Sequence, residues 1–463
     1  MRTRIAATAL ALVALVAATA GQPQPVDLIV YNAIVVTMDA GGRVLPRGAV
    51  AIRGNQIVAV EPADAIASAF SARETIDAGG QIVMPGLINT HGHAPMVLYR
   101  GLADDLALME WLQKYIFPAE AKTVTPAFVR AGTRLAALEM IQSGTTTYTD
   151  MYYFEEEIAR VTREAGMRGV LGQTIIQFPV ADAKTPAEGL ARTEAFLKAF
   201  AGDELITPAL APHAMYTLDA ATLKAVRAMA DTHQAPVLIH LAETSDESQT
   251  SQKQHKMSPT RYLESLGFWG PRTLAAHAVW LDDADIAILA KRTVGVSHNP
   301  ESNMKLASGT AKIPALRKAG VSVGLGTDGA ASNNDLDMFE AMRQAAFLHK
   351  LTSNDPRTLP AREILAMATI EGAKALGMDD RIGSLEAGKR ADLILVSMAG
   401  ARQTPMYDPI SHLVYVARGD DVRTTIVNGK ILMRDRKMLT LDEAAIIREA
   451  NEYAQKVREA VGK

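Results

Sequence analysis

The spacing of hydrophobic residues changes along the chain and predicts two kinds of architecture. Residues 26–84 contain short apolar runs separated by Gly, Asn and Pro, which is typical of a small β unit. Similar runs return in residues 385–440, where 413–417 is expected to be a strand and Asn428 followed by Gly429 the turn of a hairpin. The two ends of the chain are therefore predicted to build one β-sandwich.

Between these ends, residues 85–384 alternate strand-like runs with helical segments. That order is typical of a parallel sheet whose strands are connected by helices. One helix is expected to begin at Thr125 and Pro126 and to end at Gly144. The strand-like runs number eight, which fits an α/β fold with a (β/α)₈ TIM barrel. They lie at residues 82–91, 145–150, 169–176, 206–212, 236–240, 273–278, 294–298 and 321–327.

Both ends of the chain carry further signals. Residues 441–463 are expected to form a C-terminal helix that begins with a capping box of Thr440 and Glu443. Arg2 and Arg4 precede an uncharged stretch, which predicts a cleavable signal peptide over residues 1–20. A membrane anchor is the alternative, but the stretch is shorter than the ~20 apolar residues that span a bilayer. We therefore expect export, to the periplasm or the medium, with no membrane attachment after cleavage.

Composition narrows the classes of partner. Of 463 residues, 48 are Lys or Arg and 51 are Asp or Glu, which gives a net charge of −3. The chain therefore lacks the basic field that holds nucleic acid or anionic lipid, and a small-molecule partner is expected. It has no cysteine, so thiol nucleophiles and thiolate metal sites are excluded, and any metal must be bound by His and carboxylates.

Ionisable residues gather where the predicted strands end. His91 and His93 stand two residues apart after an apolar run, so both imidazoles face one side of an extended chain. Such a pair alone is weak evidence for a metal, because surface and core histidines are more common. The fourth to eighth runs, however, each end in one ionisable residue, and independent core histidines would not be sorted in this way. These residues are His213, His240, His277, His298 and Asp328.

Four segments carry a family resemblance. They are V-M-P-G-L-I-N-T-H-G-H-A-P-M, H-L-A-E-T, S-H-N-P-E-S-N-M-K-L-A-S-G and G-T-D-G-A-A-S-N-N. Together they resemble the amidohydrolase superfamily, and within it the branch of S-adenosylhomocysteine and methylthioadenosine deaminases. The resemblance covers nearly everything after residue 26. It implies a metal-bearing (β/α)₈ barrel beside a β-sandwich built from both chain ends, which agrees with the pattern above, and a homo-oligomer.

The resemblance also implies a ligand set. His91, His93, His240 and Asp328 match the residues that hold one divalent ion, expected to be Zn²⁺ with Fe²⁺ as the alternative. Such an ion lowers the pKa of its water to ~7, so that hydroxide exists at neutral pH. Relatives with two ions carry a bridging carboxylated lysine after the fourth strand. The corresponding stretch here is I-T-P-A-L-A-P-H-A, without lysine, so a single ion is expected.

Three residues match catalytic positions. Glu243, three residues after His240, matches a proton donor to the ring nitrogen of a bound heterocycle. His277 matches the residue that orients the attacking hydroxide, with a core histidine as the alternative interpretation. Asp328 is expected to bind the metal and to carry the proton from water to the leaving amine, so that ammonia departs and the ring carbon becomes a carbonyl.

Substrate contacts follow from the same resemblance. Trp111 matches an aromatic border of the ligand, Glu120 an acceptor for ribose hydroxyls, and His213 a ligand contact; helix packing and a solvated helix end are the alternatives for Trp111 and Glu120. Relatives that accept an amino-acid tail use arginines after the third strand, where this chain has G-V-L-G-Q-T-I-I-Q-F-P. Arg168 is the basic residue left nearby as a substrate contact. A carboxylate-bearing substrate is therefore questionable, and a smaller or neutral nucleoside is favoured.

These observations predict a hydrolase of carbon–nitrogen bonds in cyclic amidines. In it, metal-bound hydroxide deaminates an adenine nucleoside such as 5′-methylthioadenosine, adenosine or an S-adenosylhomocysteine-like compound. One alternative is the same chemistry on a pterin, guanine or triazine, or hydrolysis of an N-acyl amino acid. A second alternative is a non-catalytic binding or scavenging protein with the same fold.

Overall fold

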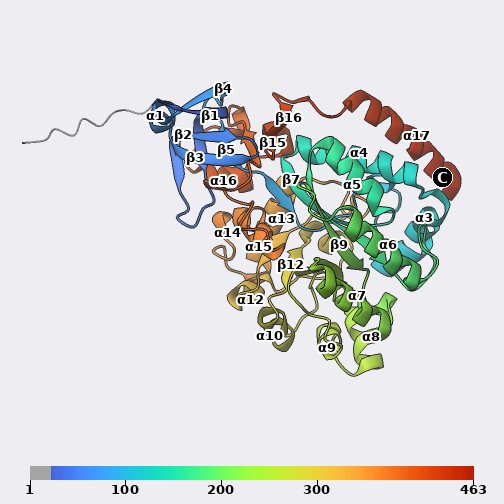
Figure 1. Ribbon diagram of the computed structural model, residues 1–463. Coiled ribbons are helices and arrows are strands. Elements are labelled where there is room, and N and C mark those ends of the chain that lie inside the picture. The colour runs from blue at the N-terminus through green and yellow to red at the C-terminus, as the bar shows by residue number, and fades with distance from the viewer. Residues whose placement is uncertain (1–21, 463) are drawn as a thin grey trace, which may run out of the picture.

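The computed structural model describes residues 22–462, which form a parallel barrel beside a sheet built from both ends of the chain (Figure 1). This arrangement confirms the predicted fold class. The expected signal peptide, residues 1–20, lies outside the described residues. Within them, no helix is long and apolar enough to cross a membrane.

The sheet at the chain ends contains nine strands among the described residues, and β5 and β14 join its two halves. β5 pairs antiparallel with β14, with Val83 opposite Leu395. The early half consists of β1 (Gln24–Val36), β2 (Val44–Arg53), β3 (Gln56–Pro62), β4 (Phe70–Asp77) and β5 (Ile82–Pro85), with helix α1 (Ala63–Ala69) before β4. The late half consists of β14 (Leu393–Val396), β15 (Val422–Val427), β16 (Lys430–Arg434) and β17 (Lys437–Met438).

This end sheet curls around one apolar core. Val30 of β1, Val50 of β2 and Leu393 of β14 are all buried in the same cluster. The curl also brings β3 to the segment before β14, where the backbone N–H of Ile57 donates to the carbonyl of Lys389 at 2.9 Å. The two ends of the chain thus share one core, as the hydrophobic pattern predicts.

Two local expectations for the late residues are wrong. Residues 413–417 do not form a strand, because most of them belong to helix α16 (Pro409–Tyr415), which Asp408 caps by accepting from the N–H of Ile410 at 2.8 Å. The C-terminal helix α17 (Glu443–Val461) is capped by Asp442 and not by Thr440. The Thr440 hydroxyl instead donates to the carbonyl of Ala165 at 2.8 Å, which ties the chain to the barrel before the helix begins.

The barrel has eight parallel strands among the described residues, in sequence order around the ring. They are β6 (Leu87–Asn89), β7 (Thr145–Tyr152), β8 (Arg168–Ile175), β9 (Ile206–Pro212), β10 (Val237–Leu241), β11 (Thr273–His277), β12 (Gly295–His298) and β13 (Val323–Leu325). The ring closes between β13 and β6, where the N–H of Thr90 donates to the carbonyl of Leu325 at 2.9 Å. The predicted run 82–91 is divided, because the chain leaves the end sheet after β5 and enters the barrel at β6.

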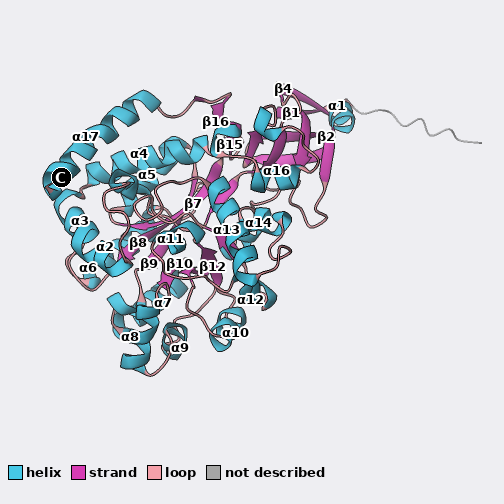
Figure 2. Ribbon diagram, turned by 180° about the vertical axis from the view of Figure 1, so that it is seen from behind, coloured by secondary structure: helices cyan, strands magenta, loops and turns pink. Residues whose placement is uncertain are grey.

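Helices surround the barrel strands (Figure 2). Helix α4 (Pro126–Gln142) begins as predicted, since the hydroxyl of Thr125 accepts from the N–H of Phe128 at 3.2 Å. The others in this part of the chain are α5 (Glu155–Ala165), α6 (Pro186–Ala199), α7 (Ala220–His233), α8 (Ser245–His255), α9 (Pro259–Ser265), α10 (Asp283–Lys291), α11 (Pro300–Lys305), α12 (Ile313–Lys318), α13 (Met338–Ser353), α14 (Ala361–Met367) and α15 (Ile370–Ala375). Short 3₁₀ turns are η3 (Met215–Thr217), η4 (Ala401–Gln403) and η5 (Gly419–Asp421).

A helical insert between β6 and α4 covers the mouth of the barrel. It consists of η1 (Ala94–Tyr99), α2 (Leu108–Trp111), the π-helical turn η2 (Leu112–Ile116) and α3 (Phe117–Thr123). Helix α17 packs along α3 and α4, so the end of the chain supports this insert (Figure 2).

Candidate active site

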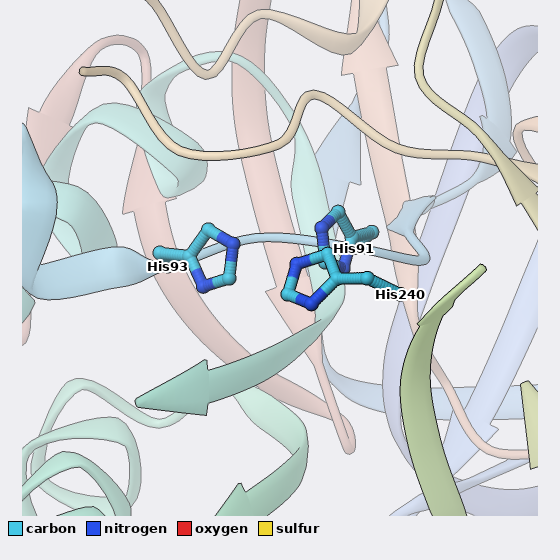
Figure 3. A group of neighbouring side chains, drawn as sticks. All are labelled: His91, His93 and His240. Carbon is cyan, nitrogen blue, oxygen red and sulfur yellow. The ribbon is translucent and has the colours of Figure 1, made fainter. Parts of the chain in front are cut away.

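Four side chains that could bind a metal ion meet at the carboxyl ends of the barrel strands. His91 and His93 follow β6, His240 lies in β10, and Asp328 follows β13. The ring centroid of His91 lies 4.9 Å from that of His93 and 5.0 Å from that of His240. Figure 3 shows the three imidazoles gathered in one place, two from the segment after β6 and one from β10. This is the end of a TIM barrel where catalytic residues are found.

Backbone carbonyls fix the tautomers of two of these rings. His93 Nδ1 donates to the carbonyl of Met151 at 2.8 Å, and His240 Nδ1 donates to that of His213 at 2.8 Å. A carbonyl oxygen only accepts, so Nδ1 carries the hydrogen in each ring. The Nε2 lone pairs of His93 and His240 are therefore free to bind a cation, as is usual for histidine ligands.

Asp328 completes a donor set that fits a divalent cation. Its Oδ1 lies 3.3 Å from His91 Nε2 and 3.2 Å from His93 Nε2. Its Oδ2 accepts from the hydroxyls of Ser302 at 2.7 Å and Ser332 at 3.0 Å, which hold the carboxylate in place. His91 Nε2 is buried and has no hydrogen-bond partner. Three imidazoles and one carboxylate, with a buried nitrogen left unsatisfied, match the ligands that zinc takes in catalytic sites.

Electrostatics in this cluster also favour a cation. Burial lowers the pKa of His91 to about 4 and of His213 to about 3, so both rings are neutral at physiological pH. Burial opposes ionisation of Asp328, but its contacts with His91 and His93 outweigh burial and hold its pKa well below the usual range. Burial also lowers the pKa of His93, but the hydrogen bond and charge of Asp328 raise it to about 9. The buried carboxylate of Asp328 therefore stabilises a positive charge beside it, whether a proton on His93 or a bound cation.

Glu243 and His277 lie beside the metal-ligating cluster. His277 Nδ1 donates to Asn303 Oδ1 at 2.9 Å, so its Nε2 is left as an acceptor. That Nε2 lies 3.8 Å from Glu243 Oε2. Burial raises the pKa of Glu243, which favours the protonated acid that a general-acid role needs. His277 adopts a left-handed backbone with φ 69°, and Asp328 does so with φ 66°. Such conformations cost a non-glycine residue free energy, and the contacts around His277 and Asp328 must hold them.

Glu247 holds the turn that carries Glu243, and our sequence analysis does not name it. Its buried carboxylate accepts from the N–H of Ala242 at 2.9 Å and from the N–H of Glu243 at 3.0 Å. Ala242 itself has a left-handed backbone with φ 47°. The signal for this contact is Thr244 followed three residues later by Glu247, which is the spacing of a capping box.

One cavity joins the cluster to the predicted substrate residues. It has a volume of about 670 Å³ including its mouth and is lined by Trp111, Glu120 and His213 together with Glu243 and His277. Trp111 and Glu120 are buried here, so Glu120 is not a solvated helix end. Additional lining residues that the sequence analysis does not name are Tyr152, Tyr153, Tyr216 and Ser332.

Glu120 is held by a tyrosine. Tyr152 Oη donates to Glu120 Oε1 at 2.6 Å, and burial raises the pKa of Glu120 to about 7. The signal for Tyr152 is its position at the carboxyl end of β7, one strand after the two histidines.

Arg168 does not contribute to this cavity, so its expected substrate contact is wrong. It is the first residue of β8, and barrel strands present their carboxyl ends to the site. Its guanidinium is buried against Asp392, with Nε 2.9 Å from Oδ2 and Nη2 3.2 Å from Oδ1. Arg168 therefore links the barrel to the end sheet. His298 is also buried away from the cavity, with its Nε2 3.0 Å from His349 Nε2.

Comparison with known proteins gives consistent similarities. Residues 82–432 match the model of the amidohydrolase family. The chain is 47% identical over 432 residues to a 5-methylthioadenosine/S-adenosylhomocysteine deaminase of Syntrophobacter fumaroxidans, covering 93% of this chain and 98% of the relative. It is 45% identical over 433 residues to a 5′-deoxyadenosine deaminase of Methanosarcina mazei, with the same coverage. An adenosine deaminase from Xanthomonas campestris, solved with bound zinc, superposes with a TM-score of 0.93 at 41% identity, covering 94% of this chain and 100% of the other.

Proposed function

This chain belongs to the amidohydrolase family, and on that premise we propose that it hydrolytically deaminates an adenine nucleoside. The observation that carries the proposal is one cavity that contains a metal-binding cluster, a buried acid and a buried carboxylate suited to ribose. Glu243 and Glu120 both line this cavity. The relatives named above act on adenine nucleosides by name, which supports the same substrate class here.

The cofactor we propose is one Zn²⁺ per chain, held by His91, His93, His240 and Asp328, with Fe²⁺ as the alternative. The bound zinc in the Xanthomonas campestris structure and the unsatisfied Nε2 of His91 support it. When bound, such an ion supplies Lewis acidity and lowers the pKa of a water molecule toward neutrality.

The side chains of this protein then move the protons. Glu243, as the neutral acid, donates its proton to the purine nitrogen beside the carbon that carries the amino group, which makes that carbon electrophilic. His277 Nε2 accepts a hydrogen bond from the attacking water, while Asn303 fixes the opposite side of the ring. Asp328 takes a proton from that water and passes it to the amine. The carbon–nitrogen bond breaks and ammonia departs. The second proton of the water passes from the oxygen to Glu243, which restores the acid, and a carbonyl remains.

Glu120 and Trp111 position the rest of the nucleoside. A carboxylate accepts two hydroxyl donors, so Glu120 suits the vicinal diol of ribose. Tyr152 orients that carboxylate through the bond to Oε1. Trp111 is buried and lines the same cavity, where its ring borders the ligand.

The proposal is tested by a substrate screen on the zinc-loaded protein that measures ammonia release and, for the N-acyl amino acid, release of the free amino acid. Adenosine, 5′-deoxyadenosine, 5′-methylthioadenosine and S-adenosylhomocysteine are the candidate substrates, and guanine, a pterin, a triazine and an N-acyl amino acid represent the alternative reactions. We expect ammonia and the corresponding hypoxanthine nucleoside from at least one adenine nucleoside. Turnover of one of the other compounds alone would overturn the nucleoside assignment, and zinc-loaded protein inactive on all of them would favour the binding protein.

We also propose export, which rests on the basic, then apolar, then small-residue pattern of residues 1–20. Mass spectrometry of the protein recovered from its native cells should find a mature chain that begins at Gly21. An intact Met1 would contradict it.

A further inference from the structure

A second hollow continues from the catalytic cavity toward solvent. The two share Phe117, Glu120 and Tyr153, so a ligand that reaches Glu120 stands at the boundary between them. The outer hollow, here called the outer groove, lies between the helical insert and the loop after β8. Its remaining lining residues are Gln113, Ala121, Phe178, Pro179, Val180 and Ala181.

The walls of the outer groove are mainly apolar. The rings of Phe117 and Phe178 meet edge to face with centroids 5.5 Å apart, which joins the insert to the loop. The loop is braced by a hydrogen bond from the N–H of Val180 to the carbonyl of Ala183 at 2.8 Å. Phe178 nevertheless keeps 37% of its surface exposed, which leaves an aromatic face for a ligand.

The groove offers no cation to an anionic ligand. Among its lining residues in the described part of the chain, the polar side chains are those of Gln113, Glu120 and Tyr153. Asp182, next to Ala181, does not line the groove, because its carboxylate is buried and accepts from the N–H of Phe154 at 2.7 Å and from Gln173 Nε2 at 2.9 Å.

Two cations stand near this loop: Lys184 on the loop is exposed and does not line the groove, and Arg192 in α6 is already engaged. Arg192 binds Glu156 Oε1 at 2.7 Å and lies 3.3 Å from Asp182 Oδ2, with its guanidinium 5.4 Å from the ring centroid of Phe154. A carboxylate that entered the groove would lose its hydration without gaining a partner.

We propose that the outer groove receives the substituent on C5′ of the ribose and selects nucleosides in which that substituent is short and uncharged. The inference rests on the proposed function, because it places the ribose at Glu120 with the base toward the histidine cluster. A methylthio group then contacts Phe117 and Phe178. An amino-acid tail, as in S-adenosylhomocysteine, brings its carboxylate to a groove that contains only acidic and neutral side chains.

The first test compares substrates on the zinc-loaded full chain. We expect kcat/KM for 5′-methylthioadenosine to exceed that for S-adenosylhomocysteine by about tenfold or more, because a carboxylate that gives up part of its hydration to an apolar groove without gaining a partner is disfavoured. If the two values agree within about threefold, the inference fails while the proposed function stands. If no adenine nucleoside is deaminated, the proposed function fails and the inference falls with it.

The second test changes the groove. Ala181 is exposed, so Ala181→Arg adds a cation at the rim without burying it. We expect the ratio of kcat/KM for S-adenosylhomocysteine to that for 5′-methylthioadenosine to rise about tenfold, and to fall in the matched variant Ala181→Glu. An unchanged ratio in both variants would overturn the assignment.

A third variant tests the apolar wall. Phe178→Ala should lower kcat/KM for 5′-methylthioadenosine by about tenfold relative to 5′-deoxyadenosine, which has no sulfur or S-methyl group to reach the ring. Phe347→Ala removes an exposed aromatic on α13 that lies outside both cavities; it is the control and should leave that ratio unchanged. Equal losses on both substrates in Phe178→Ala would contradict a contact with the 5′ substituent.

Discussion

At the scale of single residues, one cavity contains two buried carboxyl groups, one suited to donate a proton and the other to accept hydrogen bonds. Glu243 lies beside His277, where burial favours its acid form, and Glu120 lies against Tyr152, where it accepts hydrogen bonds. The spacing of strand ends in the sequence predicts that ionisable residues gather at one edge of the barrel, and the family resemblance implies which of them bind the metal. It does not predict Tyr152 or Glu247, since their contacts depend on how a side chain leaves its strand or turn.

Glu243→Gln should retain the metal and lose activity. The amide is nearly the same size as the acid but cannot donate the proton, and general acid–base groups contribute about 10²- to 10⁴-fold to turnover. The measurement is kcat for ammonia release together with zinc content by elemental analysis. Asp246→Asn makes the same chemical change at an exposed neighbour and is the control. Wild-type turnover in Glu243→Gln would contradict the assigned role.

The pH dependence of KM should report Glu120. Its pKa is raised to about 7, so the carboxylate that accepts the ribose hydroxyls is present above that pH and is lost below it. We therefore expect KM for adenosine to rise as pH falls from 8 to 6. 2′,3′-Dideoxyadenosine, which lacks the diol, should show a weaker dependence, as should Glu120→Gln with adenosine. The same steep rise in all three experiments would show that another group titrates.

At the scale of elements, errors in the sequence predictions arise where tertiary contacts decide the local structure. Residues 413–417 are a short apolar run whose periodicity fits a strand or a buried helix. Ile410, Leu413 and Val414 pack one face of α16 into the core, and the cap at Asp408 starts the helix. Threonine is a common helix-capping residue, but the hydroxyl of Thr440 donates to the carbonyl of Ala165. Asp442 caps the helix instead.

The turn between β10 and α8 gives an element-scale prediction. Glu247→Gln leaves one acceptor oxygen for two backbone donors, so the N–H of Ala242 or of Glu243 loses its partner, which costs about 1–3 kcal/mol. We expect kcat to fall at least about tenfold through misplacement of Glu243, with a smaller change in KM and in zinc content. Urea unfolding and steady-state kinetics measure the two effects. Unchanged kcat in a destabilised variant would assign Glu247 to stability alone.

At the scale of the whole molecule, the barrel and the end sheet meet through buried charge. Arg168 and Asp392 come from β8 and from the residue before β14, and both are almost fully buried. Arg168 lies at the amino end of its strand, which places it at the face of the barrel opposite the active site. What the sequence could not show is its partner, 224 positions away.

Asp392→Ala should destabilise the protein without changing its chemistry. Removal of one partner leaves a buried guanidinium unpaired, which costs about 3–5 kcal/mol. We expect a lower free energy of unfolding in urea and an unchanged KM for the folded protein. Asp380→Ala, an exposed acid in the same region of the chain, is the control. A raised KM in Asp392→Ala would instead indicate that Arg168 contributes to substrate binding.

The path from β5 to β6 has a consequence for synthesis on the ribosome. β5 and β6 are separated by one residue, and His91 follows two residues after β6. The strand that pairs with β5 on one side is β14, which is translated roughly three hundred residues later. When the whole barrel has left the ribosome, β14 has not yet been made. β5, the strand that leads into β6 and His91, therefore still lacks its pairing with β14. Activity should therefore appear late, after the final strands have left the exit tunnel.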